Sequence, residues 1–514
     1  MSSVRRIKLY GKKEVNMLSG SVFKGLMVIA IPIMIMNVLQ SLFNIIDMTI
    51  LKMYDTDGGY SVGAVGTCGN LISFVTGLGI GISAGANVVI ARNIGRGDKN
   101  GVEESVNTAL IFSVVCGLIL LIIGVSFANV FLGFVNCPTR FFDKAVLYFR
   151  LYFLGIPIFL FYNFCASILR ASGDSKRPML FLTIGGIVKV LLTFLFVAVF
   201  KMEVVGVSIA TIISWIVTAF LCIISLIRDE GVLKVNFKKF RIYGKELKEM
   251  LRIGVPAGLQ QALYSLANLV IVGAVNSYGS TDIIRANAST GVSIANQFDG
   301  ILYQVAVGPS YAVMPYVSQN VGAKNMKRAK EAIFKGILIT TIFGGGLGAL
   351  SAIFSGTLSS IMSSNPQVIM FSQQKMMLIS STYFICGINE ILGASLKGMG
   401  KPIIPMIATM IFMCGIRFPW VWFIYPLFQN LTFLYTIWPI GWILSSTMVI
   451  SFLIPTTKKI QRELDGNEEL VVEKKISIFA KIKWNKEVSS VIGYSLFLGA
   501  ISLSLLIGVL VICL

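Results

Sequence analysis

The apolar positions of this chain form long runs that recur from one end of the sequence to the other. A helix that crosses a membrane needs about 20 apolar residues to span a hydrocarbon core of about 30 Å. The strands of a membrane β-barrel would instead alternate apolar and polar positions over about 10 residues. The pattern predicts an all-α polytopic membrane protein with 13 transmembrane helices, at residues 24–50, 62–91, 106–132, 145–169, 179–200, 203–227, 254–277, 287–318, 334–358, 367–396, 403–427, 430–454 and 488–512.

Two charged segments interrupt the otherwise short connections between these runs. The first contains VNFKKFRIYGKELKEMLR, which we expect to form an amphipathic helix on the membrane surface between two six-helix lobes. The second precedes a thirteenth helix that has no counterpart. The expected regions are an N-terminal segment at 1–23, an N-lobe at 24–227, a linker at 228–253, a C-lobe at 254–454, a charged loop at 455–487 and the extra helix at 488–514.

The two lobes repeat each other in sequence. IPIMIMNVLQSLFN at 31–44 parallels VPAGLQQALYSLAN at 255–268, and ARNIG at 91–95 parallels SQNVG at 318–322. LRASGDSKRPM at 169–179 parallels LKGMGKPIIPM at 396–406. Because six helices is an even number, both lobes start on the same side and are related by an axis along the membrane normal. Such parallel repeats place the substrate between the halves, which rock against each other.

Composition and charge agree with a membrane protein and indicate its orientation. Charged residues make up 13% of the chain, compared with about 25% in soluble proteins. If the N-terminus is cytoplasmic, 35 of the 44 lysines and arginines lie in segments on that side. This positive-inside bias predicts a multi-pass protein of the cell membrane, with a cytoplasmic N-terminus and an external C-terminus. The net charge of +20 is thereby explained by topology and contact with the lipid bilayer, not by nucleic-acid binding.

Residue types that support most enzymatic and metal chemistry are scarce. The chain has no histidine, and seven of its eight cysteines lie inside apolar runs, where a thiol behaves as a small hydrophobe. We therefore expect no metal site, no disulfide framework and no enzymatic activity.

The first helix carries a polar stripe of Asn37, Gln40, Asn44 and Asp47. Spacings of three and four residues put these side chains on one face, and such a stripe is costly against lipid. It should face a water-filled cavity, with Asp47 either as a buried protonatable group or as an acid at the interface. The seventh helix repeats the stripe with Gln261, Tyr264 and Asn268, which serve either substrate contacts or helix–helix hydrogen bonds.

Further charges lie inside the predicted spans. Lys189 is close to the middle of the fifth helix and needs an acid partner or a cavity, and Asp47 is the expected acid. Their pairing could be structural or functional. Asp299, Glu390 and Arg417 are also charged residues inside predicted spans, with either a structural or a coupling role. Glu390 and Arg417 could form a buried pair. Lys375 is expected near a helix end, at the membrane interface.

The sequence resembles the multidrug and toxic compound extrusion (MATE) transporters over about residues 20–455. The resemblance is carried by FNIIDMTIL, ILRASGDSKRPM, GVSIATIIS, VSQNVGAK followed by KRAK, and CGINEILGASLKGMG followed by MCGIRFPWVW. It implies two six-helix lobes around a V-shaped cavity. It also implies export of amphipathic, often cationic, small molecules driven by inward H⁺ or Na⁺, with no other cofactor.

The resemblance also implies roles for particular residues. Asp47 matches the first-helix aspartate that binds the coupling cation, Thr211 the threonine near it, and Asn163 a polar residue of the fourth helix. The fifth helix departs from the family, with Lys189 where an asparagine is common and Thr193 where an aspartate is common. A lysine beside Asp47 would repel Na⁺ and therefore favours H⁺ coupling.

The leading hypothesis is a monomeric antiporter that exports amphipathic or cationic compounds by alternating access between the lobes. The alternative is a flippase for a lipid-linked oligosaccharide or another anionic lipid. A flippase would need several cations lining its cavity, and in the N-lobe the sequence offers Lys189 as its one strong candidate.

Overall fold

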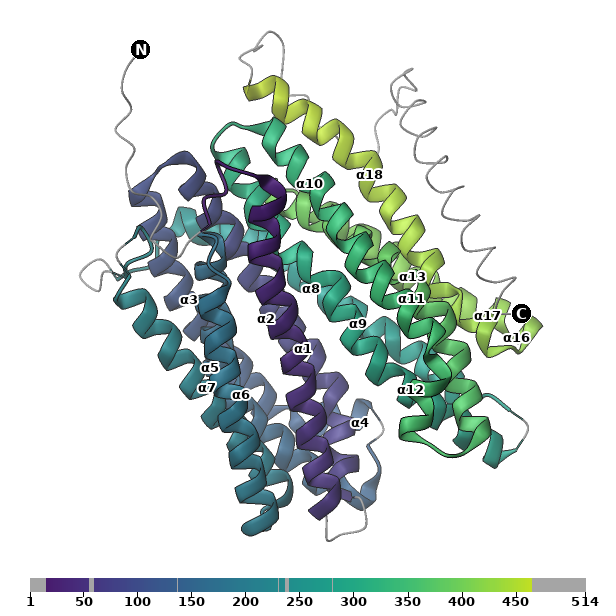
Figure 1. Ribbon diagram of the computed structural model, residues 1–514. Coiled ribbons are helices and arrows are strands. Elements are labelled where there is room, and N and C mark those ends of the chain that lie inside the picture. The colour runs from purple at the N-terminus through teal and green to yellow at the C-terminus, as the bar shows by residue number, and fades with distance from the viewer. Residues whose placement is uncertain are drawn as a thin grey trace, which may run out of the picture.

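The computed structural model in Figure 1 describes residues 15–54, 60–135, 137–229, 231–235, 240–279 and 281–464. These residues form a bundle of helices, and none of them lies in a strand. Within these ranges, eleven helices are long and apolar enough to cross a membrane. The predicted thirteenth helix at 488–512 lies outside the described residues, as do residues 1–14 and 465–487.

The N-lobe contains six long helical segments in chain order. Its helices are α1 (Val22–Tyr54), α2 (Tyr60–Arg96), α3 (Lys99–Ser126), the short α4 (Ala128–Phe134), α5 (Phe142–Ala171), α6 (Lys176–Thr193), which continues as a π-helix over Phe194–Val199, and α7 (Glu203–Ile227).

The C-lobe repeats this plan with more interruptions. Its helices are α8 (Gly244–Asn276), α9 (Asp282–Gly322), α10 (Met326–Thr340), α11 (Gly346–Ile353), α12 (Ser355–Met362), α13 (Pro366–Gly398), α14 (Ile403–Ala408), α15 (Arg417–Pro419), α16 (Tyr425–Phe428), α17 (Leu431–Tyr435) and α18 (Ile437–Leu464). Stretches of π-helix join α10 to α11 at Thr341–Gly345, α14 to the turn before α15 at Thr409–Gly415, and α15 to α16 at Trp420–Ile424.

Two predicted connections are shorter than expected because the neighbouring helices extend into them. Residues 244–252 of the predicted linker are the first turns of α8, not a separate amphipathic helix on the membrane surface. Glutamate and lysine are good helix formers, so the sequence KELKE lengthens a helix that apolarity alone would start later. Similarly, α18 continues through Pro455 to Leu464, which the sequence assigned to the charged loop.

The expected eighth span lies in α9, which is not among the eleven apolar helices. This helix of 41 residues carries polar side chains along much of its length, such as Asn287, Asn296 and Asp299. It packs against α13, α1, α2 and α10, so neighbouring helices cover much of its surface. The predicted split into twelve helices plus one is therefore supported only in part.

The repeated motif that follows α5 and α13 has a backbone explanation. Gly173 and Gly400 adopt φ values of +97° and +78°, in the left-handed region that favours glycine. A side chain would also collide there, because a Cβ on Gly173 would lie 2.6 Å from the carbonyl oxygen of Val15. Both lobes therefore end the corresponding helix in the same way.

The lobes join at one end of the bundle, where α1 and α8 begin and α2 and α9 end. We call it the basic end, because the short connections there, at 92–104, 170–177, 320–335 and 397–401, are rich in lysines and arginines. Towards the opposite end, at the bottom of Figure 1, the α1–α7 and α8–α18 ribbons diverge. The junction consists mainly of α2 packed on α8 and of α1 packed on α9.

Glycines allow the backbones of α2 and α8 to touch. Gly81 and Gly85, from the GxxxGxxxG sequence of α2, face Gly258 and Gly254 of α8. A Cβ on Gly81 would lie 2.3 Å from the Cα of Gly258, and one on Gly254 would lie 2.5 Å from the carbonyl oxygen of Ile82. Small residues are what permit such close approach of membrane helices.

The ends of α2 and α9 approach each other equally closely, and each helix contributes one glycine to the contact. A Cβ on Gly95 would lie 2.0 Å from the carbonyl oxygen of Gln319, and one on Gly322 would lie 2.3 Å from that of Arg92. Gly95 and Gly322 are equivalent in the repeat, as are Arg92 and Gln319. The junction therefore follows the twofold relation that the sequence repeat predicts.

We predict that Gly254→Ala loosens this junction, because overpacking of this kind costs about 1–3 kcal/mol. Gly273→Ala on the same helix is the control, since a Cβ there meets open space. The midpoint of thermal unfolding in detergent should fall for the first variant and stay equal or rise for the second. Equal midpoints for the two variants would show that the close contact does not determine stability.

Candidate functional site

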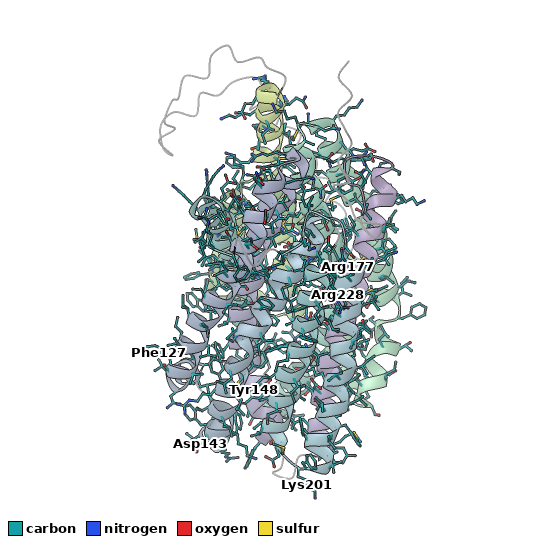
Figure 2. All side chains as sticks on the ribbon, turned by 90° about the vertical axis from the view of Figure 1, so that its left-hand side faces the viewer. Phe127, Asp143, Tyr148, Arg177, Lys201 and Arg228 are labelled. Atoms are coloured by element: carbon teal, nitrogen blue, oxygen red, sulfur yellow. The ribbon has the colours of Figure 1, made fainter. Side chains whose placement is uncertain are left out.

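The N-lobe encloses a cavity of about 450 Å³ between α1, α2, α5, α6 and α7. Five of the residues predicted for the site line it, namely Gln40, Asn44, Asp47, Lys189 and Thr211. Aromatic side chains of α5 and α7, including Tyr148 and Trp215, complete the wall. Figure 2 shows Tyr148 lying, along the length of the lobe, between Asp143 and Lys201 at one end and Arg177 and Arg228 towards the other.

Asp47 is the centre of the polar contacts in this cavity. Its side chain is buried, and its Oδ2 atom lies 2.5 Å from Nζ of Lys189. Thr193 Oγ1 donates a hydrogen bond of 2.9 Å to Oδ1 of the same carboxylate. Lys189 also donates to Oδ1 of Asn44 at 3.1 Å. Both oxygens of the carboxylate are thus engaged by α6.

Helical spacing explains why these four side chains meet. Asn44 and Asp47 are three residues apart on α1, and Lys189 and Thr193 are four apart on α6, so each pair shares one face. Directly after Thr193, α6 changes into a π-helix over Phe194–Val199. Such π segments are frequent at functional sites because they break the regular hydrogen-bond ladder.

Other residues predicted for this lobe have hydrogen-bond partners of their own, away from the Asp47 carboxylate. Thr211 lines the cavity, but its hydroxyl donates to the carbonyl oxygen of Val207 in its own helix. Asn163 is bonded in the same way to the carbonyl oxygen of Phe159. Neither Asn163 nor the buried Asn37 is among the residues lining the cavity.

The C-lobe encloses a second cavity, of about 380 Å³. Tyr264, Asn268 and Asp299, which the sequence predicted for the site, line it together with several aromatic side chains. Asp299 Oδ2 lies 2.9 Å from Nζ of Lys375, and both residues are buried. Lys375 also donates to Oδ1 of Asn296. Each lobe therefore holds one aspartate–lysine pair inside a cavity.

The prediction that Lys375 lies at the interface is wrong. The helix α13 begins at Pro366, so Lys375 stands more than two turns inside it, opposite α9. The sequence signal that could have revealed its burial is Asp299, a membrane-embedded acid that requires a cation nearby.

The predicted pair of Glu390 and Arg417 is also not formed. Arg417 is buried and donates from Nη1 to Oδ1 of Asn268 at 2.7 Å. Glu390 lines a small separate cavity of about 30 Å³ at the junction of the lobes, together with Gln261 and Lys397. The two residues lie on different helices, α13 and α15, and sequence alone does not give their relative rotation.

A polar network that the sequence did not reveal closes the junction at the basic end. Glu246 of α8 accepts hydrogen bonds from Ser105 Oγ at 2.7 Å and from Asn93 Nδ2 at 3.2 Å. Arg92 lies 3.4 Å from Glu249 of α8. Gln319 of α9 donates to the carbonyl oxygen of Ala171 in the other lobe at 2.7 Å. These bonds join the two lobes and would have to break for that end to open.

We predict that the buried pair of the C-lobe behaves as a unit. Asp299→Asn and Lys375→Met each leave a buried charge without its partner, which typically costs about 3–5 kcal/mol. The double variant removes both charges and should therefore be more stable than the sum of the single losses implies. Midpoints of thermal unfolding in detergent measure all three. Lys459→Met, in the exposed Lys459–Glu463 pair, is the control and should change little. Additive losses would contradict the buried pairing.

Comparisons with known proteins agree with this architecture. The model of the MatE family matches residues 32–195 and 256–423, one segment in each lobe. "Probable multidrug resistance protein YoeA" of Bacillus subtilis is 27% identical over 407 residues, which cover 78% of this chain and 86% of that protein. "Multidrug export protein MepA" of Staphylococcus aureus is 24% identical over 336 residues, covering 65% and 72% respectively.

A solved structure shares the fold. It is described as an outward-facing conformation of a multidrug resistance MATE family transporter, and it aligns with a TM-score of 0.80 at 20% identity. The alignment covers 88% of this chain and all of that one. Members of the family are membrane transporters and not enzymes. Because the family model matches a segment in each lobe, the chain belongs to the MatE family of multi-pass membrane transporters.

Proposed function

We propose that this protein is a secondary exporter of amphipathic compounds, cationic ones included, which it exchanges for H⁺ across the cell membrane. The observation that carries the proposal is the buried contact of Asp47 with Lys189 and Thr193 inside the N-lobe cavity. The relatives named as multidrug resistance and multidrug export proteins support export of small molecules. We also propose that the chain has twelve transmembrane helices in two lobes plus a thirteenth, and that it acts as a monomer.

The geometry around Asp47 favours H⁺ over Na⁺ as the coupling ion. The Lys189 ammonium already occupies one carboxylate oxygen, and the Thr193 hydroxyl occupies the other. A Na⁺ ion would have to displace the ammonium and would then lie beside a like charge. A proton needs no such space, because it binds to a carboxylate oxygen and only weakens the existing contacts.

We infer the direction of transport from charge placement. The basic end faces the cytoplasm by the positive-inside rule, so the lobes are closed there and the divergent ends face outside. A proton from outside neutralises Asp47 and releases Lys189 from its counter-ion. The facing surfaces of α1 and α6 then rearrange, and substrate leaves the cavity. The return step opens the basic end by breaking bonds such as that between Arg92 and Glu249.

The flippase alternative is not favoured. Its anionic lipid would need free cations in the N-lobe cavity, but Lys189 is engaged by Asp47 and Asn44. The named relatives also support multidrug export.

We predict that an imposed pH gradient drives ethidium efflux by the wild-type protein in proteoliposomes, with no need for Na⁺. Asp47→Asn should reduce this efflux at least ten-fold, because its amide cannot exchange a proton. Lys189→Ala should also reduce it, since Asp47 loses its partner. Lys52→Ala, an exposed position at the end of α1, is the matched control and should transport normally. Efflux driven by Na⁺ that is abolished in Asp47→Asn but retained in Lys189→Ala would exclude H⁺ coupling at this pair.

A further inference from the structure

The residues that line the two C-lobe cavities or bond to that lining hold more positive than negative charge. Among the described residues there, the cations are Lys375, Lys397 and Arg417, and the acids are Asp299 and Glu390. Asp299 is paired with Lys375, and Glu390 lines the small junction cavity together with Lys397. Arg417 is the remaining charge, so this group of five residues carries a surplus of one positive charge.

Arg417 is only 1% exposed, yet its hydrogen bonds are incomplete. Nη1 donates to the Asn268 carbonyl oxygen, whereas Nε and Nη2 have no hydrogen-bond partner among the described residues. Its guanidinium carbon lies 5.7 Å from the centre of the Tyr264 ring and 5.3 Å from that of Trp438. The aromatic faces partly stabilise the cation but do not neutralise it.

A buried cation without a counter-ion is costly inside a membrane, and such residues usually serve a function there. The three neighbours of Arg417 named above all line the C-lobe cavity, whereas Arg417 is not itself a lining residue. A ligand in the cavity would therefore reach the guanidinium by displacing the Asn268 side chain. The Asn268 amide oxygen occupies the position in which an anionic oxygen would accept the same hydrogen bond. A carboxylate in that position would supply the missing charge, and guanidinium groups bind carboxylates through two parallel hydrogen bonds.

Aromatic side chains supply much of the remaining wall, which also contains aliphatic residues and the Asp299–Lys375 pair. Tyr264 and Tyr303 stack with ring centres 6.2 Å apart, and Tyr383 packs on Trp442 at 5.7 Å. Rings of this kind favour planar aromatic ligands. A volume of about 380 Å³ lies within the range that holds small organic molecules.

We propose that the C-lobe cavity is a binding site for planar aromatic carboxylates, with the carboxylate at Arg417 and Asn268 and the ring against the tyrosines and tryptophans. This inference rests on the proposed function in one respect: the ligand is a substrate only if the protein is an exporter. Binding is measured without any gradient. A failure of H⁺ coupling and a failure of this site are therefore separate results.

The test uses three fluorescent probes that share one ring and differ in charge: anthracene-9-carboxylate, 9-anthracenemethanol and 9-(aminomethyl)anthracene. Binding to the purified full chain in detergent is measured by fluorescence anisotropy, with empty micelles as the blank. We expect the carboxylate to bind at least ten-fold more tightly than the alcohol, and Arg417→Gln should weaken binding of the carboxylate probe without weakening binding of the ammonium probe. Equal binding of the carboxylate and the alcohol by the wild-type protein would overturn the proposal.

Two variants locate the site. Arg417→Gln removes the cation, and Asn268→Asp supplies an internal counter-ion where the amide now bonds Arg417. Each should remove the preference for the carboxylate, and Asn268→Asp should also raise the unfolding temperature, which keeps the test valid if Arg417→Gln does not fold. Lys52→Ala, at an exposed position at the end of α1, should retain the preference. A preference that survives in either folded C-lobe variant, or that is lost in Lys52→Ala, would overturn the assignment.

Discussion

The close contact of α2 with α8 is the constraint on which the rest of the arrangement depends. Gly81 and Gly85 meet Gly258 and Gly254 with no room for a Cβ atom, so the two lobes touch backbone to backbone. The crossing holds the lobes together in the half of the bundle nearer the basic end and lets their other ends diverge. A contact between small residues involves few interlocking side chains, and it therefore suits a junction about which two rigid lobes rock.

Buried charge is the second organising feature, and each lobe handles it differently. The N-lobe cavity balances Asp47 with Lys189, so a single proton changes the net charge of that site. In the C-lobe, Asp299 is balanced by Lys375, and Arg417 remains without an acid. We infer a division of labour in which the N-lobe pair responds to H⁺ and the unpaired cation of the C-lobe binds carboxylates.

Much of the architecture follows from the sequence because the membrane limits the choices. Long apolar runs predict the helices. The repeats make Gly173 and Gly400 equivalent positions of the two lobes, and both adopt the same left-handed backbone conformation. The pairing of Asp47 and Lys189 could also be anticipated, because each charge needs a partner at a similar depth.

The errors concern helix ends and helix rotation. Lys375 lies more than two turns inside α13 and is buried against Asp299 of α9, a contact between distant segments that the position of Lys375 in its own helix does not reveal. Glu390 lies beside Gln261 and Lys397, whereas Arg417 bonds Asn268 about two turns further along α8. Apolar sequence around a helix contains no periodicity that fixes its rotation. The network of Glu246 at the basic end joins residues more than 140 positions apart, so only the folded arrangement reveals it.

The most direct test of the central claim is a count of the protons released when ethidium binds to the purified protein in weakly buffered detergent solution. If substrate and H⁺ exclude each other through Asp47, the wild-type protein releases protons when ethidium binds, within some part of the pH range tested. Asp47→Asn should bind ethidium without releasing any. Equal proton release from both proteins, or ethidium binding to the wild type without release at any pH, would contradict the account.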